Sequence, residues 1–207
     1  MDTKGQIVDD IPITGKPKKR STGIVGLNLL LDGGFQPSSI IMVYGTPLAG
    51  VDLAAMQFWK VEGEEGTYLM NDGDVEIGMQ DVTELHPDMY LPQMVGGRIV
   101  IDSLSTVIIK YGIDAALKFL RHAREMMRER GANLMFIVYT NVHTPVEMTR
   151  IMRAADIVLE LKTETHQNEI ERTLTVHKIR DSAAPQRLLP FIITDRGIEA
   201  STTSRVV

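Results

Sequence analysis

The 207-residue sequence contains no cysteine, which excludes disulfide frameworks, thiolate metal sites and cysteine nucleophiles. It also lacks long apolar runs. The longest, such as residues 39–44 and 134–139, have about six residues, whereas a membrane-spanning helix needs roughly 18. The N-terminus is polar and has no apolar signal-peptide core. The sequence therefore predicts a cytoplasmic protein without a membrane segment.

Basic residues are absent from one long part of the chain. None of the 22 Lys and Arg residues lies between Lys60 and Arg98, a stretch with nine carboxylates, and the net charge of the chain is −5. This stretch is either a solvated face or a surface that repels phosphates or recruits a basic partner. The acidic balance speaks against nucleic-acid binding. The five His residues lack the spacing of metal ligands, so no metal site is predicted.

What the sequence does have is an alternation of short apolar strands and helical patterns. Strands are predicted at residues 40–44, 67–70, 98–102, 134–139 and 156–161, and helices at 23–31, 51–62, 114–130 and 145–154. This order implies a parallel sheet with right-handed crossovers. Segments 171–178 and 189–194 predict an added antiparallel hairpin. Residues 1–20 are interpreted as a partly mobile arm that precedes a single domain over residues 21–207.

One loop has part of the pattern of a phosphate-binding loop. Gly45 and Gly50 have the spacing of its two outer glycines and lie between a strand and a helix. Such a loop also needs a Lys to reach the phosphates and a hydroxyl to hold Mg²⁺. Those two positions are Val51 and Asp52 here, and Leu48 replaces the middle glycine. The two glycines alone are weak evidence for a nucleotide site.

Several segments, taken in order, resemble the KaiC-like branch of the RecA/RadA ATPase superfamily. They are Thr22–Leu27 with Leu30–Gly34, the loop Gly45–Asp52, the segment Arg98–Ser105 that resembles the Walker B strand, and the C-terminal motifs His177–Asp181 and Leu189–Ile198. The resemblance covers about residues 21–200. It implies a RecA-like α/β fold of the P-loop NTPase superfamily, with a mainly parallel central sheet flanked by helices and a C-terminal antiparallel hairpin.

The resemblance also implies roles for single residues. Asp102 matches the acid that orients Mg²⁺, and Asn71 with Asp72 falls where active members have the paired glutamates that activate water. Asn141 follows a strand at the sheet edge where sensor residues lie in active relatives. Lys178 and Arg180 match a Lys-x-Arg motif that approaches the nucleotide of a neighbouring subunit in hexameric relatives.

These residues also have ordinary structural interpretations, which remain open. Asp102 can be a helix cap or a turn residue, and Asn141 can be a polar strand end. Lys178 and Arg180 share one face of a strand and can be a solvated or subunit-facing pair. Asp52 can supply the anion that a helix start favours. Basic and acidic side chains on the predicted helix 114–130 indicate a salt-bridged exposed face: Arg121, Arg124, Arg128, Glu125 and Glu129.

The altered loop determines the expected nucleotide affinity. Losing a charged hydrogen bond from Lys costs about 1.5–3 kcal/mol. A carboxylate about 4 Å from a phosphate charge adds about 4 kcal/mol of repulsion at an effective dielectric constant of about 20. ATP affinity is therefore expected to fall by about three to five decades. The nucleotide site would survive only as remnants: Gly45, Gly50, Val51, Asp52, Asn71, Asp72, Asp102 and Asn141.

The resemblance and the altered loop together predict a catalytically inactive KaiC-like protein without a cofactor. It would act as a regulatory or scaffolding subunit, through protein partners or an oligomer with itself or with other KaiC-like subunits. Signal transduction is the expected context, because standalone KaiC-like proteins are common in archaea and are linked to it. One alternative is a protein that binds ATP and Mg²⁺, or hydrolyses ATP weakly, through a non-standard loop. A less favoured alternative is a DNA-binding recombinase relative.

Overall fold

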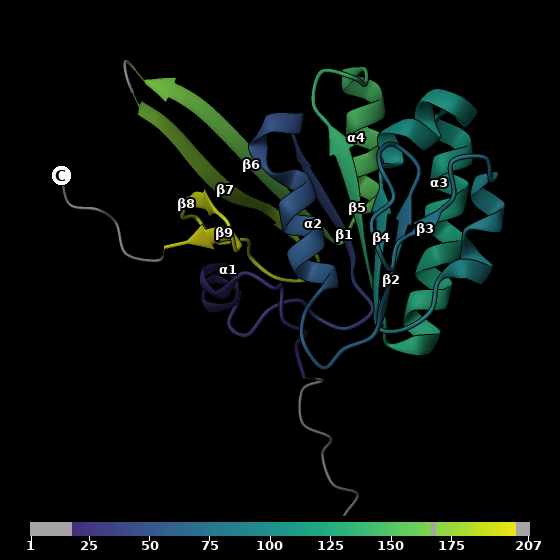
Figure 1. The fold of residues 1–207 in the computed structure, drawn as a ribbon, viewed down its shortest axis with the longest axis horizontal. Coiled ribbons are helices and arrows are strands. Elements are labelled where there is room, and N and C mark those ends of the chain that lie inside the picture. The colour runs from purple at the N-terminus through teal and green to yellow at the C-terminus, as the bar shows by residue number, and fades with distance from the viewer. Residues whose placement is uncertain (1–17, 167–168, 202–207) are drawn as a thin grey trace, which may run out of the picture.

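In the computed structural model, residues 18–166 and 169–201 are described, and within them one mixed sheet forms the centre of the molecule (Figure 1). The spatial order of its nine strands is β3-β2-β4-β5-β1-β6-β7-β8-β9. Strands β1 to β6 run parallel, whereas β7 to β9 are antiparallel additions, so the predicted α/β fold is confirmed. The parallel strands are β1 (Ile40–Gly45), β2 (Gly66–Met70), β3 (Gln80–Asp81), β4 (Arg98–Asp102), β5 (Asn133–Tyr139) and β6 (Ile157–His166).

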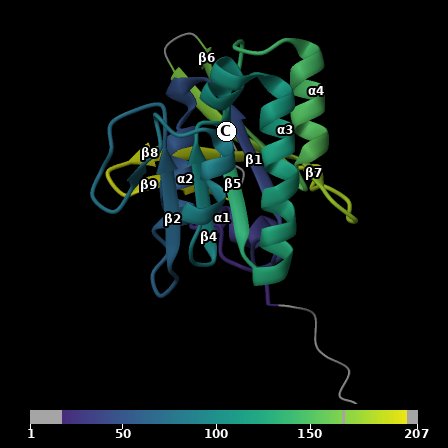
Figure 2. The same cartoon turned by 90° about the vertical axis from the view of Figure 1, so that its right-hand side faces the viewer.

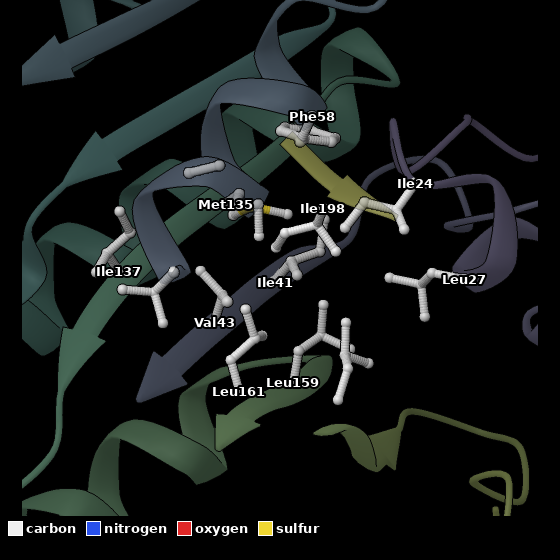
Figure 3. Packing of buried hydrophobic residues seen from close by; sticks show 14 of the residues in the cluster. Ile24, Leu27, Ile41, Val43, Phe58, Met135, Ile137, Leu159, Leu161 and Ile198 are labelled. Carbon is white, nitrogen blue, oxygen red and sulfur yellow. The ribbon is translucent and has the colours of Figure 1, made fainter. Parts of the chain in front are cut away.

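Helices cover both faces of the sheet because the central strands are apolar on both sides. Helices α1 (Val25–Leu30) and α2 (Val51–Trp59) lie on one face, and α3 (Leu104–Arg130) and α4 (Pro145–Ala154) lie on the other. Ile41 and Val43 of β1 pack with Phe58 on the α2 face, as Figure 3 shows. The alternate residues Ile40 and Met42 pack on the α3 face. No helix in the described part of the chain is long and apolar enough to cross a membrane.

Helix α3 is longer than its apolar pattern indicates. The sequence predicts a helix only from residue 114, whereas α3 begins at Leu104, where the Ser103 hydroxyl caps it by accepting a hydrogen bond from the Thr106 amide. Gly112 interrupts the helix with φ 81° and ψ 162°. This backbone conformation suits glycine, which has no Cβ. The break changes the direction of the apolar stripe, which is why the pattern from 114 onward does not extend back to Leu104.

The C-terminal part forms two antiparallel hairpins instead of the single one predicted. β6 continues to His166 and pairs along its length with β7 (Glu169–Ile179), and this ribbon projects from the body of the molecule (Figure 1). β8 (Leu189–Thr194) pairs with β7 only at Thr173 and Leu174, and its main partner is β9 (Gly197–Ala200). The outer half of β6 has no apolar face, since Lys162, Glu164 and His166 are exposed, and therefore gives no strand signal.

A buried arginine joins the start of β4 to three other segments. The Arg98 side chain is inaccessible to solvent, and its guanidinium donates to the backbone oxygens of Ser21 (2.8 Å) and Phe58 (2.9 Å) and to Glu64 Oε1 (2.8 Å). Arg20 forms a second ion pair with Glu64 and also donates to the Gly131 carbonyl. Arg20, which the sequence places at the end of an arm, thus contacts the folded domain through these two groups, and residues 1–17 of that arm lie outside the described residues.

We expect Arg98→Ala to lower the free energy of unfolding by about 3–5 kcal/mol, because it leaves the Glu64 carboxylate and two carbonyls without their buried donor. Arg98→Lys should recover only part of the loss, since an ammonium group cannot reproduce the planar fork. Urea denaturation followed by circular dichroism measures both. Arg196→Ala is the matched control, because the Arg196 side chain is 80% exposed. Equal stability of the Arg98→Ala and Arg196→Ala variants would contradict this role of the ion pair.

Candidate functional site

The carboxyl ends of the parallel strands bring most of the predicted site residues to one edge of the sheet. Strands β2, β4 and β5 lie side by side (Figure 2), and β1 follows β5 in the sheet. The loop from Gly45 to Asp52 leaves the end of β1, and Asp102 is the last residue of β4. Asn71 and Asp72 follow β2, and Asn141 follows β5. This edge is where open α/β sheets bind their ligands.

The two outer glycines of the loop are required by packing within this chain. A Cβ on Gly45 would lie 2.4 Å from the Leu161 carbonyl oxygen, and one on Gly50 would lie 3.2 Å from Ile193 Cδ1. Gly50 also has a left-handed backbone, with φ 85°. Between them, Pro47–Ala49 form a 3-10 turn in which the Ala49 amide donates to the Thr46 carbonyl at 3.0 Å. That amide is therefore used inside the loop and is not available to a phosphate.

The lysine and hydroxyl positions of a phosphate loop are occupied by very different side chains. Val51 is fully buried and belongs to the hydrophobic core on the α2 face. Asp52 is exposed in the first turn of α2, where the helix dipole favours a negative charge. Among the described residues its carboxylate accepts no hydrogen bond from the helix start. Asp52 thus lies where the sequence places the anion, in the first turn of α2, but it does not cap the helix through a hydrogen bond.

Asp102 is a buried carboxylate held by a tyrosine. It is 5% exposed, and the Tyr68 hydroxyl donates to its Oδ2 at 2.7 Å. Burial is the main cause that raises the pKa of Asp102, and the charges of Asp72 and Asp52 raise it further. The hydrogen bond from Tyr68 lowers it only in part, so the pKa of Asp102 remains above its ordinary value. The alternative that Asp102 caps a helix is wrong, because Ser103 is the cap of α3.

The residues at the positions of the paired glutamates have structural contacts. Asn71 is buried, and its side chain donates to the Tyr90 hydroxyl (3.1 Å) and accepts from the Ser103 amide (2.6 Å). Asp72 accepts from the Ser103 hydroxyl at 3.1 Å. An amide at position 71 cannot act as a general base. Instead, the hydrogen bonds of Asn71 and Asp72 to Ser103 hold the start of α3 beside Asp102.

Tyr139, at the start of the segment 139–141 that the sequence places at this edge, is joined here by Ser105 and His143. Burial, and then the charges of Asp102, Asp72 and Asp52, raise the pKa of Tyr139. The Ser105 hydroxyl accepts from the Tyr139 amide (2.9 Å) and lies 2.8 Å from His143 Nε2. Burial lowers the pKa of His143, although the charge of Glu147 opposes this. No spacing motif connects these residues, and only the strand pairing brings them together.

Asn141 and the Lys-x-Arg motif are placed differently. Asn141 is exposed in a left-handed turn (φ 65°) at the same edge as Asp102. Lys178 pairs with Val158 near the amino end of β6, at the opposite edge of the sheet. Its ammonium donates to the carbonyls of Met152 (3.0 Å) and Ala155 (2.6 Å) at the end of α4, and Arg180 pairs with Asp156. Within one chain the motif is therefore not part of the site.

The residues at the carboxyl edge do not fit a magnesium-bound polyphosphate. The segment from Gly45 to Asp52 contains no basic side chain, its Ala49 amide is already bonded, and Val51 is buried. After burial, the charges of Asp72 and Asp52 also raise the pKa of the Asp102 carboxyl at this edge. No group of three or more His, Asp or Glu side chains in the described segments is arranged to hold a metal ion.

Comparison with known proteins identifies similar chains. The family model described as "ATPase: KaiC" matches residues 81–204. A protein of Thermotoga maritima called "UPF0273 protein" is 22% identical over 87% of this chain and 95% of its own length. The crystal structure of a KaiC-like protein from the hyperthermophilic archaeon Pyrococcus horikoshii has a TM-score of 0.72 at 18% identity, covering 89% of this chain and 99% of that one. The structural likeness supports the RecA-like fold predicted from the sequence.

We expect Asp102→Asn to increase stability at neutral pH. Asn keeps an acceptor for the Tyr68 hydroxyl but removes the buried charge. Because the folded-state pKa lies above the ordinary value of 3.8, the ionised carboxylate destabilises the folded state above that pKa. The gain should shrink as the pH falls through the folded pKa toward 3.8. Urea denaturation at a series of pH values measures it, with the exposed Asp74→Asn as control. A gain in stability that does not vary with pH would contradict the raised pKa of Asp102 as its cause.

Proposed function

This chain belongs to the KaiC family of ATPases, and on that premise we propose that it is a member without ATPase activity that acts as a regulatory or scaffolding subunit in signal transduction. The observation that carries the proposal is the burial of Val51 in the core at the position of the phosphate-binding lysine. A core valine offers no hydrogen bond and no charge to a phosphate. The loop therefore keeps its place in the fold without the group that binds ATP.

The charges at the carboxyl edge support the same proposal. Asp52 takes the place of the hydroxyl that would hold Mg²⁺, and it raises the pKa of Asp102. A polyphosphate entering this edge meets Asp52, Asp72 and Asp102, and repulsion between like charges costs several kcal/mol at short range. In active members a glutamate at position 71 activates water. Here that position holds Asn71, whose side-chain amide is already hydrogen-bonded to the Tyr90 hydroxyl and to the Ser103 amide.

The extent of the family match is consistent with a loss of nucleotide-binding residues that is confined to the first half of the domain. The matched residues begin at Asp81, after both the Gly45–Asp52 loop and the Asn71-Asp72 pair. They include Asp102 and the Lys-x-Arg motif. The family match therefore covers the chain from the end of β3 through the C-terminal hairpins, and it leaves out the segment in which we propose that the phosphate-binding residues are altered.

Protein partners, including further copies of this chain or active KaiC-like subunits, are the proposed ligands. A mixed assembly would place an inactive subunit beside active ones and so regulate them. Exposed apolar side chains at the carboxyl edge, Leu48 at 82% and Val146 at 70%, are available to such contacts.

The family match favours one alternative, a weak ATPase with a non-standard loop. It would need a cation from a neighbouring subunit in place of the missing lysine. Lys178 and Arg180 are the candidates, but both already bind groups of their own chain. Magnesium-dependent ATP hydrolysis that Asp102→Ala abolishes would support this alternative and contradict the inactive assignment.

For the wild-type protein we expect no binding of ATP with Mg²⁺ tighter than about 100 μM. The reason is the combined loss of the lysine and gain of Asp52 repulsion. Isothermal titration calorimetry and a fluorescent ATP analogue provide independent measurements. An active KaiC-like ATPase serves as the positive control. A dissociation constant below that limit in both assays would overturn the proposal.

For the double variant Val51→Lys with Asp52→Thr, we expect that ATP binding does not return to the micromolar range. The Ala49 amide remains bonded to Thr46, and Leu48 still occupies the middle-glycine position. Adding Leu48→Gly should allow a partial recovery. Thermal denaturation of each variant separates misfolding from loss of binding, and Asp52→Thr alone is the control that leaves the core valine in place. Full recovery in the double variant would mean that the loop geometry is intact and only its side chains are altered.

A further inference from the structure

A hollow lies at the other edge of the sheet, away from the loop. It has a volume of about 430 Å³ and is bordered by the turn before β1, by α3, by the start of β6 and by the turn after β7. Four basic side chains and two acidic ones line it: Lys19, Arg124, Arg128, Arg180, Asp156 and Asp181. In a chain with a net charge of −5, this hollow therefore has a local excess of basic groups.

Asp156 holds two of the arginines in fixed positions. Its two carboxylate oxygens both accept from Arg124 Nη1 (2.7 Å), and Oδ2 also accepts from the Ile40 amide (2.8 Å). Arg180 binds Asp156 through Nε, which leaves its two terminal nitrogens without a partner among the described residues. The Asp156 side chain is only 8% exposed, so this carboxylate is saturated and cannot neutralise a third cation.

Arg124 and Arg128 differ from the sequence-based interpretation of α3 in different ways. The sequence predicts a salt-bridged exposed face on α3, but Arg124 pairs with Asp156 of another segment. Arg128 has no ion pair with any residue in the described ranges. Lys19 contributes one hydrogen bond to the Leu31 carbonyl (2.6 Å) and has a distant partner in the exposed Asp32 (3.8 Å). Among the described residues, the guanidinium of Arg128 and part of the Lys19 ammonium are therefore open to an anion that enters the hollow.

We propose that this hollow is a binding site for a small phosphate-bearing polyanion, separate from the altered loop. Guanidinium groups bind phosphate through paired, charge-assisted hydrogen bonds, and Arg128 and the free fork of Arg180 supply them from two sides. Hollows of roughly 300–1,000 Å³ suit small-molecule ligands. The position of Arg180 is fixed by Asp156 before any ligand arrives, which reduces the entropy lost on binding.

The site does not depend on the proposed function. It lies at the amino ends of β1 and β6, whereas the loop follows the carboxyl end of β1. A polyanion in the hollow would regulate the protein without contacting the altered loop. The two proposals can therefore fail separately.

Inorganic pyrophosphate is the probe, titrated into the full-length chain at low ionic strength by isothermal titration calorimetry. We expect a dissociation constant below about 1 mM, and an increase of at least about tenfold for Arg128→Ala. Arg121→Ala is the matched control, since Arg121 is exposed on the same helix but does not line the hollow. Asp52→Asn, a change at the loop, should leave the affinity unchanged. Backbone amide chemical shifts should change for residues 36, 38, 39 and 180–182, and not for the non-proline residues of the segment 45–52.

Three results would overturn the assignment. The first is absence of binding to the wild-type protein at about 5 mM pyrophosphate, because a specific site with the expected affinity would be mostly filled at that concentration. The second is an equal loss for Arg121→Ala and Arg128→Ala, which would indicate attraction to the general charge of the surface. The third is an oligomer that Arg128→Glu dissociates while pyrophosphate has no effect, which would make the hollow an interface between protein chains.

Discussion

The buried ion pair of Arg98 with Glu64 is the contact on which the position of the carboxyl edge depends. Arg98 begins β4, and its guanidinium ties that strand to Ser21, to the end of α2 and to the loop before β2. The register that follows places Tyr68 opposite Val100 and Met70 opposite Asp102. A shift by one residue would send the Asp102 side chain to the other face of the sheet. The ion pair at one end of β4 thus fixes the hydrogen bond between Tyr68 and Asp102 near the other end.

The two edges of the parallel sheet carry opposite charge for separate structural reasons. At the carboxyl edge, carboxylates follow β1, β2 and β4 without a basic residue in the loop between Gly45 and Asp52. At the amino edge, the saturated Asp156 gathers Arg124 and Arg180, and α3 adds Arg128. We therefore expect an anion to meet repulsion at the carboxyl edge and attraction at the amino edge.

The sequence predicts those parts of the fold that a local pattern determines. Ile40 to Tyr44 form a continuous apolar run because β1 is buried on both faces, and Thr144 with Glu147 gives the predicted helix start through a capping box. The long-range parts escape prediction. A fully buried Arg98 looks like a polar strand start, and Tyr68 becomes a partner of Asp102 only through pairing of β2 with β4. The outer half of β6 has no apolar face, so its polar residues give no strand signal.

The raised pKa of Asp102 means that an acid at this position of the carboxyl edge does not serve stability. A buried carboxylate whose ionised form is disfavoured destabilises the folded state at neutral pH, and an asparagine would keep the hydrogen bond from Tyr68 at a lower energetic cost. In a protein that needed only the fold, such a residue would be free to change. Under the proposed function, the exposed carboxylates of Asp52 and Asp72 are the groups at this edge that a basic partner surface would pair with, whereas the buried Asp102 keeps its hydrogen bond from Tyr68.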